Sequence, residues 1–402
     1  MTPISLAVLA IAAVPVPDVI DVFPSGNVHQ LRDVVSAATD GDVIRVHGGA
    51  HHSVLIHNKS LTILAVAPGV SFHRLSVVGL GPDQAAVVAG SGTATTPALG
   101  SAIELSGCAG TVHLSHIDVT GSGSFGAPSL LVNNCSDVVL HRMNVTNFVD
   151  CGYYALPCLG MNPLAIYSSR VFITESAVIG SDGLGGGPGG HGLLVQNSEV
   201  FLEDCRVLGG CGGWVSSSNP YPLHCTGNLA FILGGFGGDG IRCENNVRLH
   251  LIECEVRAGA HVPHPAGVCT NLLAQDIRTR FDTVVDLGSR FGVSLSMPNL
   301  AVEGTGVTVE VEGTPGHTLL LLVGAEPTSL SLPGVEGPLA VTGRSLGTGR
   351  FLLGPSPASS VWTAPDLAPG ATHTLWFQPL QIRPGKTVLG SVVPITIIDS
   401  IW

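Results

Sequence analysis

The sequence predicts an all-β protein, most of it wound into a parallel β-helix solenoid with a short capping helix before the first coil. Three observations support this fold class. One segment of about twenty residues recurs at least five times, and within each copy apolar and polar residues alternate over short runs. Glycine is plentiful, at 53 of 402 residues, whereas charged residues are only 11%, which suits a turn-rich β protein.

The clearest copy of the repeat is HGLLVQNSEVFLEDCRVLGG, from His191 to Gly210. It predicts three short strands, Leu193 to Val195, Val200 to Leu202 and Cys205 to Leu208, because alternation with period two is a strand signal. Further copies begin at Ile103, Leu130, Leu164 and Gly240. A multi-strand repeat of this length without a helix predicts coils that bury their inward residues on one another.

Aligning the copies predicts which side chains share a column along the solenoid. One inward column contains Ile117, Met143, Ser176, Cys205 and Cys254, and its neighbour contains Val119, Val145, Val178, Val207 and Val256. A corner column before the third strand contains His116, Arg142, Glu175, Asp204 and Glu253. The outward column beside it contains Asp118, Asn144, Ala177, Arg206 and Glu255.

The start of the repeat region, FPSGNVHQLRDVVSAATDGDVIRVHGG from Phe23, resembles the usual opening of the right-handed parallel β-helix superfamily, which includes secreted bacterial pectate-lyase-like and polygalacturonase-like proteins. The resemblance covers about residues 20 to 280 and implies the right-handed fold. Gly190-His191-Gly192 matches a short polygalacturonase-like motif, but the paired-aspartate and Arg-Ile-Lys motifs of those enzymes are absent. The resemblance therefore does not imply one chemistry.

The capping helix is expected directly after Ser25 or Asn27, either of which can cap its first turn. Leu31, Val34 and Val35, with Ala38, follow helical spacing and form one apolar stripe. Such a stripe would cover the open end of the solenoid and prevent edge-to-edge association there.

Three regions are expected along the chain. Residues 1–17 contain an apolar run with the length of a signal peptide, although its basic n-region is missing, and they suggest a secreted or cell-surface protein. Residues 18–280 form the parallel β-helix. Residues 281–402 lose the coil spacing and read as a small antiparallel β-sandwich.

Composition argues against two classes of partner. The net charge is −12 and lysine occurs only at Lys59 and Lys386, so no basic cluster is available for nucleic acid. The apolar run at the N-terminus is too short to span a bilayer.

All ten cysteines lie between Cys108 and Cys269, and an oxidising compartment fits their even number. Disulfides are expected between Cys151 and Cys158 and between Cys211 and Cys225. Cys205 and Cys254 share an inward column, which favours packed thiols at these two positions.

The corner column is the expected place for chemistry. Neighbouring coils stand about 4.8 Å apart, so Glu175, Asp204 and Glu253 would approach the roughly 5 to 5.5 Å separation of retaining glycosidase carboxylates. Arg206 is the candidate base or charge partner. Stacked carboxylates also predict a cation site, with Glu175, Asp204 and Glu253 as ligands and calcium as the expected ion.

Four connections are expected to leave the same corner of the coil, at 147–163, 180–190, 209–239 and 258–270. They contain the candidate sugar-contacting residues Tyr153, Tyr154, Trp214, Tyr221 and His191. Asp150 and Asp182, at the roots of neighbouring connections, are a second candidate acid and base pair.

Two functions follow. In the first, the protein binds a polysaccharide or cell-surface glycan in a groove along the solenoid. If it is an enzyme, it also cleaves this ligand, as a polysaccharide lyase or glycoside hydrolase. In the second, the solenoid is a non-catalytic surface or adhesion scaffold. The arrangement of the carboxylates separates them, because an enzyme needs two carboxylates in one open groove.

Overall fold

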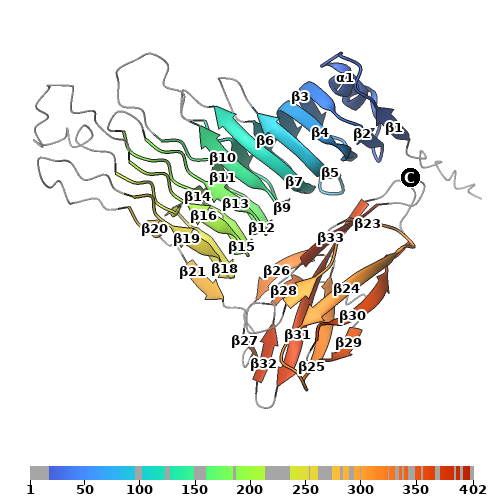
Figure 1. Ribbon diagram of the computed structural model, residues 1–402, viewed down its shortest axis with the longest axis vertical. Coiled ribbons are helices and arrows are strands. Elements are labelled where there is room, and N and C mark those ends of the chain that lie inside the picture. The colour runs from blue at the N-terminus through green and yellow to red at the C-terminus, as the bar shows by residue number, and fades with distance from the viewer. Residues whose placement is uncertain are drawn as a thin grey trace, which may run out of the picture.

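A computed structural model of the chain describes its structure over the following residues: 18–95, 102–122, 127–148, 160–183, 187–212, 236–252, 254–260, 274–280, 284–288, 294–298, 300–324, 326–330, 335–336, 339–342, 349–354, 356–366, 372–383, 386–389 and 393–398. The solenoid and the C-terminal domain are both represented in these ranges (Figure 1).

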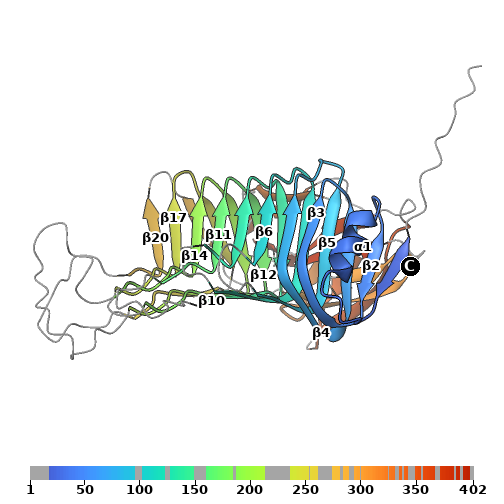
Figure 2. The ribbon, with the colours of Figure 1, turned by 90° about the horizontal axis from the view of Figure 1, so that it is seen from above.

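Within these ranges, twenty-one strands pair in parallel and form the solenoid, so the predicted right-handed parallel β-helix is confirmed. The pairings separate into three ladders, sheets 1, 2 and 3, and each coil passes through them in that order. Figure 2 shows the strands of sheet 1 side by side. Sheet 1 contains β6 (Ile103–Ser106), β8 (Leu130–Asn133), β11 (Leu164–Tyr167), β14 (Leu193–Gln196), β17 (Ile241–Glu244) and β20 (Ile277–Arg280).

Sheet 2 lies on the next side of each coil. It contains β1 (Val19–Val22), β2 (Val43–Val46), β9 (Asp137–His141), β12 (Arg170–Thr174), β15 (Glu199–Glu203), β18 (Arg248–Ile252) and β21 (Val284–Gly288). Sheet 3 contains β10 (Asn144–Phe148), β13 (Ala177–Ile179), β16 (Arg206–Leu208) and β19 (Glu255–Arg257). The long strands β3 (Gly49–His57), β4 (Leu61–Val78), β5 (Ala85–Thr95) and β7 (Thr111–Ser122) bend around corners and belong to two or three sheets.

The register confirms the predicted inward columns. Val145 pairs with Val119 on one side and with Val178 on the other, and Val207 pairs with Val178 and Val256. The first four of these valines are fully buried, and one continuous apolar core runs from Val22 to Leu251. Burial of this column from coil to coil fixes the pairing, because a shift by one residue would turn each side chain outward.

The turns between sheets 2 and 3 depend on two residues of the repeat, one in a left-handed backbone conformation and one with a small polar side chain. Between sheets 2 and 3, the described corner residues His116, Arg142, Glu175 and Asp204 have a positive φ, and Ser or Cys follows the last two. Glu175, for example, has φ +48°, and Ser176 Oγ donates to Thr174 O at 2.7 Å and accepts from Met143 N at 3.0 Å. A small polar side chain therefore satisfies two backbone groups that the turn would leave unpaired.

Helix α1 (Gln30–Ala37) covers the N-terminal end of the solenoid, as predicted (Figure 1). Leu31, Val35 and Ala38 join the solenoid core. The expected side-chain cap is wrong: His29 occupies the N-cap position and makes no capping bond, while Asn27 Oδ1 accepts from the N–H of His29 itself. No helix within the described ranges is long and apolar enough to span a bilayer.

Solenoid pairing continues beyond the predicted boundary at residue 280, because β21 still pairs in parallel with β18. The segment after it forms the predicted β-sandwich. One layer contains β22 (Ser294–Ser296), β24 (Gly306–Glu312) and β30 (Ala358–Thr363), and the other contains β25 (Thr318–Gly324), β29 (Gly349–Leu352), β31 (Thr372–Arg383) and β33 (Val393–Ile398), with β23 (Leu300–Val302) at its edge.

The two layers of the C-terminal domain share a core that includes Val309, Leu319 and Phe377. Most of its pairings are antiparallel, and the described exceptions are β23 on β33 and β27 on β32, which are parallel. The smaller strands are β26 (Glu326–Leu330), β27 (Val335–Glu336), β28 (Leu339–Thr342) and β32 (Lys386–Leu389).

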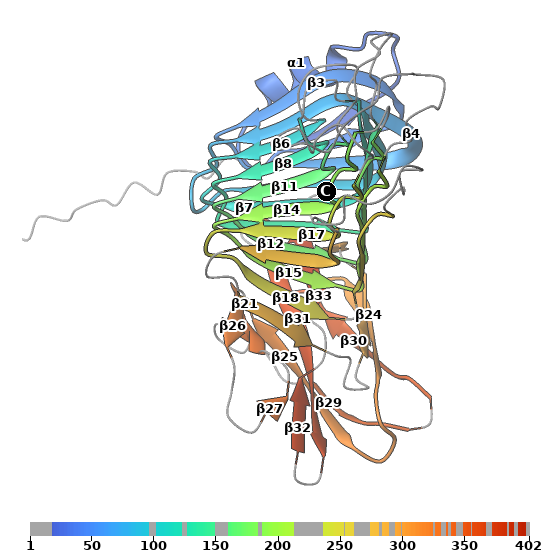
Figure 3. The ribbon, with the colours of Figure 1, turned by 90° about the vertical axis from the view of Figure 1, so that its left-hand side faces the viewer.

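The C-terminal domain packs back onto the outer side of sheet 2 (Figure 3). Trp376 on β31 is 1% exposed and lies against the outward residues Val139, Phe172 and Phe201, with ring centroids 4.7 Å apart for Trp376 and Phe172. This contact covers the middle of sheet 2, so a ligand cannot reach that part of the solenoid surface.

Candidate functional site

The predicted corner column is present, and its charged side chains form exposed ion pairs. Arg142 Nε lies 2.7 Å from Glu175 Oε2, and Arg142 Nη1 lies 3.5 Å from His116 Nε2. In the outward column beside it, Arg206 Nε lies 3.3 Å from Glu255 Oε2. Arg142 and Glu175 are 50% and 41% exposed, and pairs this exposed contribute little to stability.

The structure also shows how the coils that contain Asp204 and Glu253 relate. β16 pairs directly with β19, and the N–H of Asp204 donates to Ile252 O, so no regular coil is inserted between them. Glu253 lies outside the described residues. Within the described ranges no three His, Cys, Asp or Glu side chains are placed to hold a metal ion, so the calcium site, which needs Glu253, stays a prediction.

Most other predicted site residues, Asp150, Tyr153, Tyr154, Trp214 and Tyr221, lie outside the described residues. So does at least one cysteine of each predicted disulfide. Asp182 is described, and its Oδ1 accepts from the N–H of Cys211 at 2.6 Å. Its carboxylate therefore fixes the backbone of the next connection.

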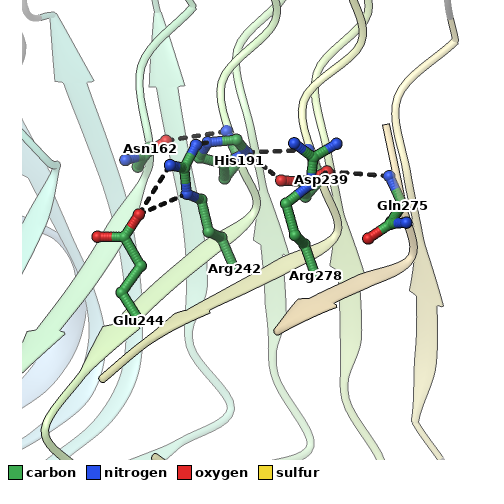
Figure 4. Close-up of polar contacts among 7 residues, drawn as sticks. All are labelled: Asn162, His191, Asp239, Arg242, Glu244, Gln275 and Arg278. Carbon is green, nitrogen blue, oxygen red and sulfur yellow. Dashed lines mark hydrogen bonds and ion pairs between the residues drawn. The ribbon is translucent and has the colours of Figure 1, made fainter. Parts of the chain in front are cut away.

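The structure brings His191 together with residues that the sequence did not connect to it (Figure 4). Asn162, His191 and Asp239 each precede the sheet 1 strand of successive coils, β11, β14 and β17. Asn162 Oδ1 accepts from the N–H of His191 at 2.8 Å, and the N–H of Asp239 lies 2.9 Å from His191 Nδ1. Residues from neighbouring coils thus meet at the same edge of sheet 1.

Asp239 is the buried anchor of this cluster. Its side chain is 1% exposed, and Oδ2 lies 3.3 Å from His191 Nδ1. Oδ1 lies 3.1 Å from Arg278 Nε and accepts from the N–H of Gln275 at 2.9 Å. Asp239 therefore contacts His191 through its backbone N–H, which donates to Nδ1, and contacts Gln275 and Arg278 through Oδ1.

Arg242 links the histidine to a second carboxylate nearer the surface. Its Nη1 lies 2.9 Å from His191 Nε2, while Nε and Nη2 lie 2.8 and 2.7 Å from Glu244 Oε1. Arg242 and Glu244 are 24% and 28% exposed. The cluster therefore contains a buried layer, Asp239, and a partly exposed layer, Arg242 and Glu244, that solvent and ligands can reach.

The imidazole of His191 is held neutral. Burial lowers its pKa to about 4, and the positive charges of Arg242 and Arg278 act in the same direction, against the opposite effects of Asp239 and Glu244. The geometry agrees, because Nδ1 already accepts from the N–H of Asp239 and the Arg242 guanidinium stands at Nε2, so a second ring proton would face one of these groups. At neutral pH His191 thus offers no positive charge of its own.

Beside this cluster, the outer side of sheet 1 has a mixed polar and aromatic surface. Tyr167, Gln196 and Glu244 are direct register partners on three successive coils, and Leu194, Arg242 and Arg278 form the next column. All six are partly exposed. Successive coils stand about 4.8 Å apart, so these groups repeat at a fixed spacing along the solenoid.

Sequence reasoning named His191 as a binding residue but missed Asp239, Arg242 and Arg278. The available signal was the position that Asn162, His191 and Asp239 share before their strands. The long chain between Leu208 and Ile241 hid this equivalence, because it breaks the repeat spacing.

No known family model matches the chain, and no curated protein matches it either. Among solved structures, it is similar to the full-length tailspike protein 2 of Escherichia coli O157:H7 bacteriophage CAB120, with 10% sequence identity and a TM-score of 0.30. The alignment covers 90% of this chain and 61% of that chain, so the chain spans about three fifths of the tailspike's length.

Proposed function

We propose that this protein binds a polysaccharide along the outer side of sheet 1. The observation that carries the proposal is the row of Tyr167, Gln196 and Glu244 on three successive coils, beside Arg242 and His191. We further expect the protein to act outside the cell or at its surface, where such a ligand is found.

The chemistry of the row suits a sugar chain. The face of Tyr167 can stack on the C–H face of a sugar ring, and the amide of Gln196 can both donate to and accept from hydroxyl groups. Glu244 adds an acceptor that Arg242 holds in place. A ligand with a repeating unit matches a surface whose contacts repeat from coil to coil.

The rest of the solenoid supports this choice of surface. The C-terminal domain covers the middle of sheet 2 through Trp376. At the corner before sheet 3 and in its first outward column, Glu175 and Glu255 form ion pairs with Arg142 and Arg206 that are more exposed than the pair of Arg242 and Glu244 in sheet 1. Sheet 1 is the described surface where aromatic, amide and charged groups lie together and partly exposed.

Cleavage is a separate prediction. It requires two carboxylates in one groove, and Glu175 and Asp204 on neighbouring coils are the candidates, with Glu253 beyond them. The exposed ion pairs of Arg142 with Glu175 and of Arg206 with Glu255 favour the alternative, a solenoid that binds or supports without cleaving, because they give these coils a solvated polar edge.

The test is binding to a panel of plant, algal, bacterial and animal polysaccharides by titration calorimetry. Tyr167→Ala should weaken binding by about two- to tenfold, since an aromatic contact contributes about 0.5 to 1.5 kcal/mol. Ser106→Ala, in the same outward column on β6, is the matched control and should bind like wild type.

Failure of every polysaccharide to bind would overturn the proposal, and equal affinity of Tyr167→Ala and wild type would move the site away from sheet 1. Product release from the bound polysaccharide, with and without calcium, decides cleavage. Activity lost in both Glu175→Ala and Asp204→Ala would assign it to the corner column.

A further inference from the structure

Six glycine-rich segments lie side by side where the coils leave sheet 3 and return to sheet 1. We call them the glycine lattice: 160–162, 180–183, 187–190, 209–212, 236–239 and 258–260. They form no regular strands. Figures 1 and 2 show them as green and yellow segments that run together beyond the ends of the sheets.

Backbone hydrogen bonds connect all six segments in one chain. The N–H of Gly259 donates to Gly238 O at 2.9 Å, that of Gly238 to Gly210 O at 2.7 Å, and that of Gly210 to Gly190 O at 2.8 Å. The chain continues from Gly190 to Ser181 O at 2.8 Å and from Ser181 to Met161 O at 3.3 Å. Outgoing and returning segments alternate along it.

The lattice has no room for side chains at its contacts. A Cβ on Gly210 would lie 1.9 Å from Ser181 O, and one on Gly238 would lie 1.9 Å from Gly190 O. Real Cβ contacts are never this short, so the backbones themselves are in contact. Glycine is required here for close approach of one backbone to another.

The returning segments lead directly into the candidate site. Gly190 precedes His191, and Gly238 precedes Asp239. Gly210 lies between them in space, because its N–H donates to Gly190 O and its own carbonyl accepts from the N–H of Gly238. One glycine of an outgoing segment therefore bridges the two backbones that carry His191 and Asp239.

We propose that the glycine lattice positions the site, and that Gly210 is a positioning residue that sets the separation of His191 and Asp239. Backbone-to-backbone bonds suit this role because they have no side-chain rotamers, so the bridged segments have a single arrangement. The proposal rests on the proposed function only for the use of the site, since the positions of the two residues can be measured without a ligand.

Hydrogen exchange of the unmodified protein is the first test. The amides of Gly190, Gly210, Gly238 and Gly259 should exchange slowly, at rates similar to the amides of sheet 1, although they belong to no strand. Rapid exchange at these four glycines, with slow exchange in sheet 1, would contradict the backbone hydrogen bonds of the glycine lattice and its positioning role.

The second test compares Gly210→Ala with Gly354→Ala. Gly354, in the C-terminal domain, has open space around its Cβ position and is the matched control. The readout is the titration of the His191 ring by NMR, which a purely structural defect elsewhere would not change.

In wild type and Gly354→Ala, His191 should stay neutral down to a pKa of about 4. In Gly210→Ala the displaced backbones admit water, and the pKa should rise toward the ordinary value of about 6.5. An unchanged titration in a folded Gly210→Ala protein would refute the positioning role. If that variant does not fold, the hydrogen-exchange result decides.

These results are independent of the polysaccharide assay. Slow exchange and a shifted His191 titration without any glycan binding would support the lattice and remove the proposed function. Glycan binding together with an unchanged His191 titration in Gly210→Ala would support the proposed function and remove the positioning role of Gly210.

Discussion

At the scale of single residues, the corner serines and cysteines show how little sequence is needed to wind a coil. Ser169, Ser176 and Ser198 each donate to the carbonyl two residues earlier and accept an N–H from the preceding coil. Cys205 and Cys254 donate to the carbonyl two residues earlier in the same way. Serine and cysteine can both occupy this corner position because each has a small side chain with one hydrogen-bond donor.

Ser176→Ala should lower the free energy of unfolding by about 1 to 3 kcal/mol, because the buried N–H of Met143 would lose its acceptor. Urea unfolding followed by circular dichroism measures this change. Ser36→Ala, at an exposed position of α1, is the control and should have little effect. Equal stability of Ser176→Ala and wild type would mean that another group, such as water, accepts from Met143.

Much of the residue pattern was predictable. The columns through Val145 and Ser176 followed from aligning the repeats, since strand alternation fixes which side chains point inward. Asp239 was not predictable as the partner of His191, because 47 residues separate them and their meeting depends on the pairing of β14 with β17. Local patterns do not encode contacts across an interrupted repeat.

At the scale of elements, the predicted strands and observed strands agree closely. The copy from His191 predicted strands from Leu193, Val200 and Cys205, and the structure has β14 from Leu193, β15 from Glu199 and β16 from Arg206. The predicted helix cap was wrong, because Asn27 Oδ1 accepts from the N–H of His29 before the helix begins, and His29 occupies the N-cap position.

The contact between β31 and sheet 2 could not be predicted, since Trp376 and Phe172 belong to different domains and no pattern relates them. Trp376→Ala should destabilise the docked arrangement by about 3 to 5 kcal/mol, the usual cost of removing a large buried aromatic side chain. Denaturant unfolding followed separately in the two domains should show the C-terminal domain unfolding earlier. Val361→Ala, at a side chain that is 68% exposed, is the control and should leave both unfolding transitions unchanged. If Trp376→Ala unfolds at the same denaturant concentration as wild type, the interface does not contribute to the stability of the C-terminal domain.

At the scale of the whole molecule, buried histidines make stability depend on pH. Burial is the main cause that lowers the pKa of His113 to about 3 and of His141 and His191 to about 4. The folded protein keeps all three neutral, whereas the unfolded chain takes up protons below a pH of about 6.5. Stability should therefore be constant above that pH and fall as the pH drops from about 6.5 toward 4.

Urea midpoints between pH 7.5 and 5 measure this effect, because most carboxylates titrate below about pH 4.3. The midpoint should fall steadily below about pH 6.5. His113→Gln should make the urea midpoint depend less on pH, since glutamine does not titrate and the unfolded variant takes up one proton fewer. A midpoint independent of pH across this window would contradict the burial of these histidines.

The pairing of β14 with β17 has one more consequence, for how such a chain can change over time. The segment between Leu208 and Ile241 is far longer than the one between Ile179 and Leu193, yet both lead into strands with the same register. The length of the connection from sheet 3 to sheet 1 therefore does not affect the register of the strand that follows it. Residues can be added or removed there without rewriting the core, which makes this side of the molecule the natural place for new specificity to evolve and for foreign peptides to be grafted.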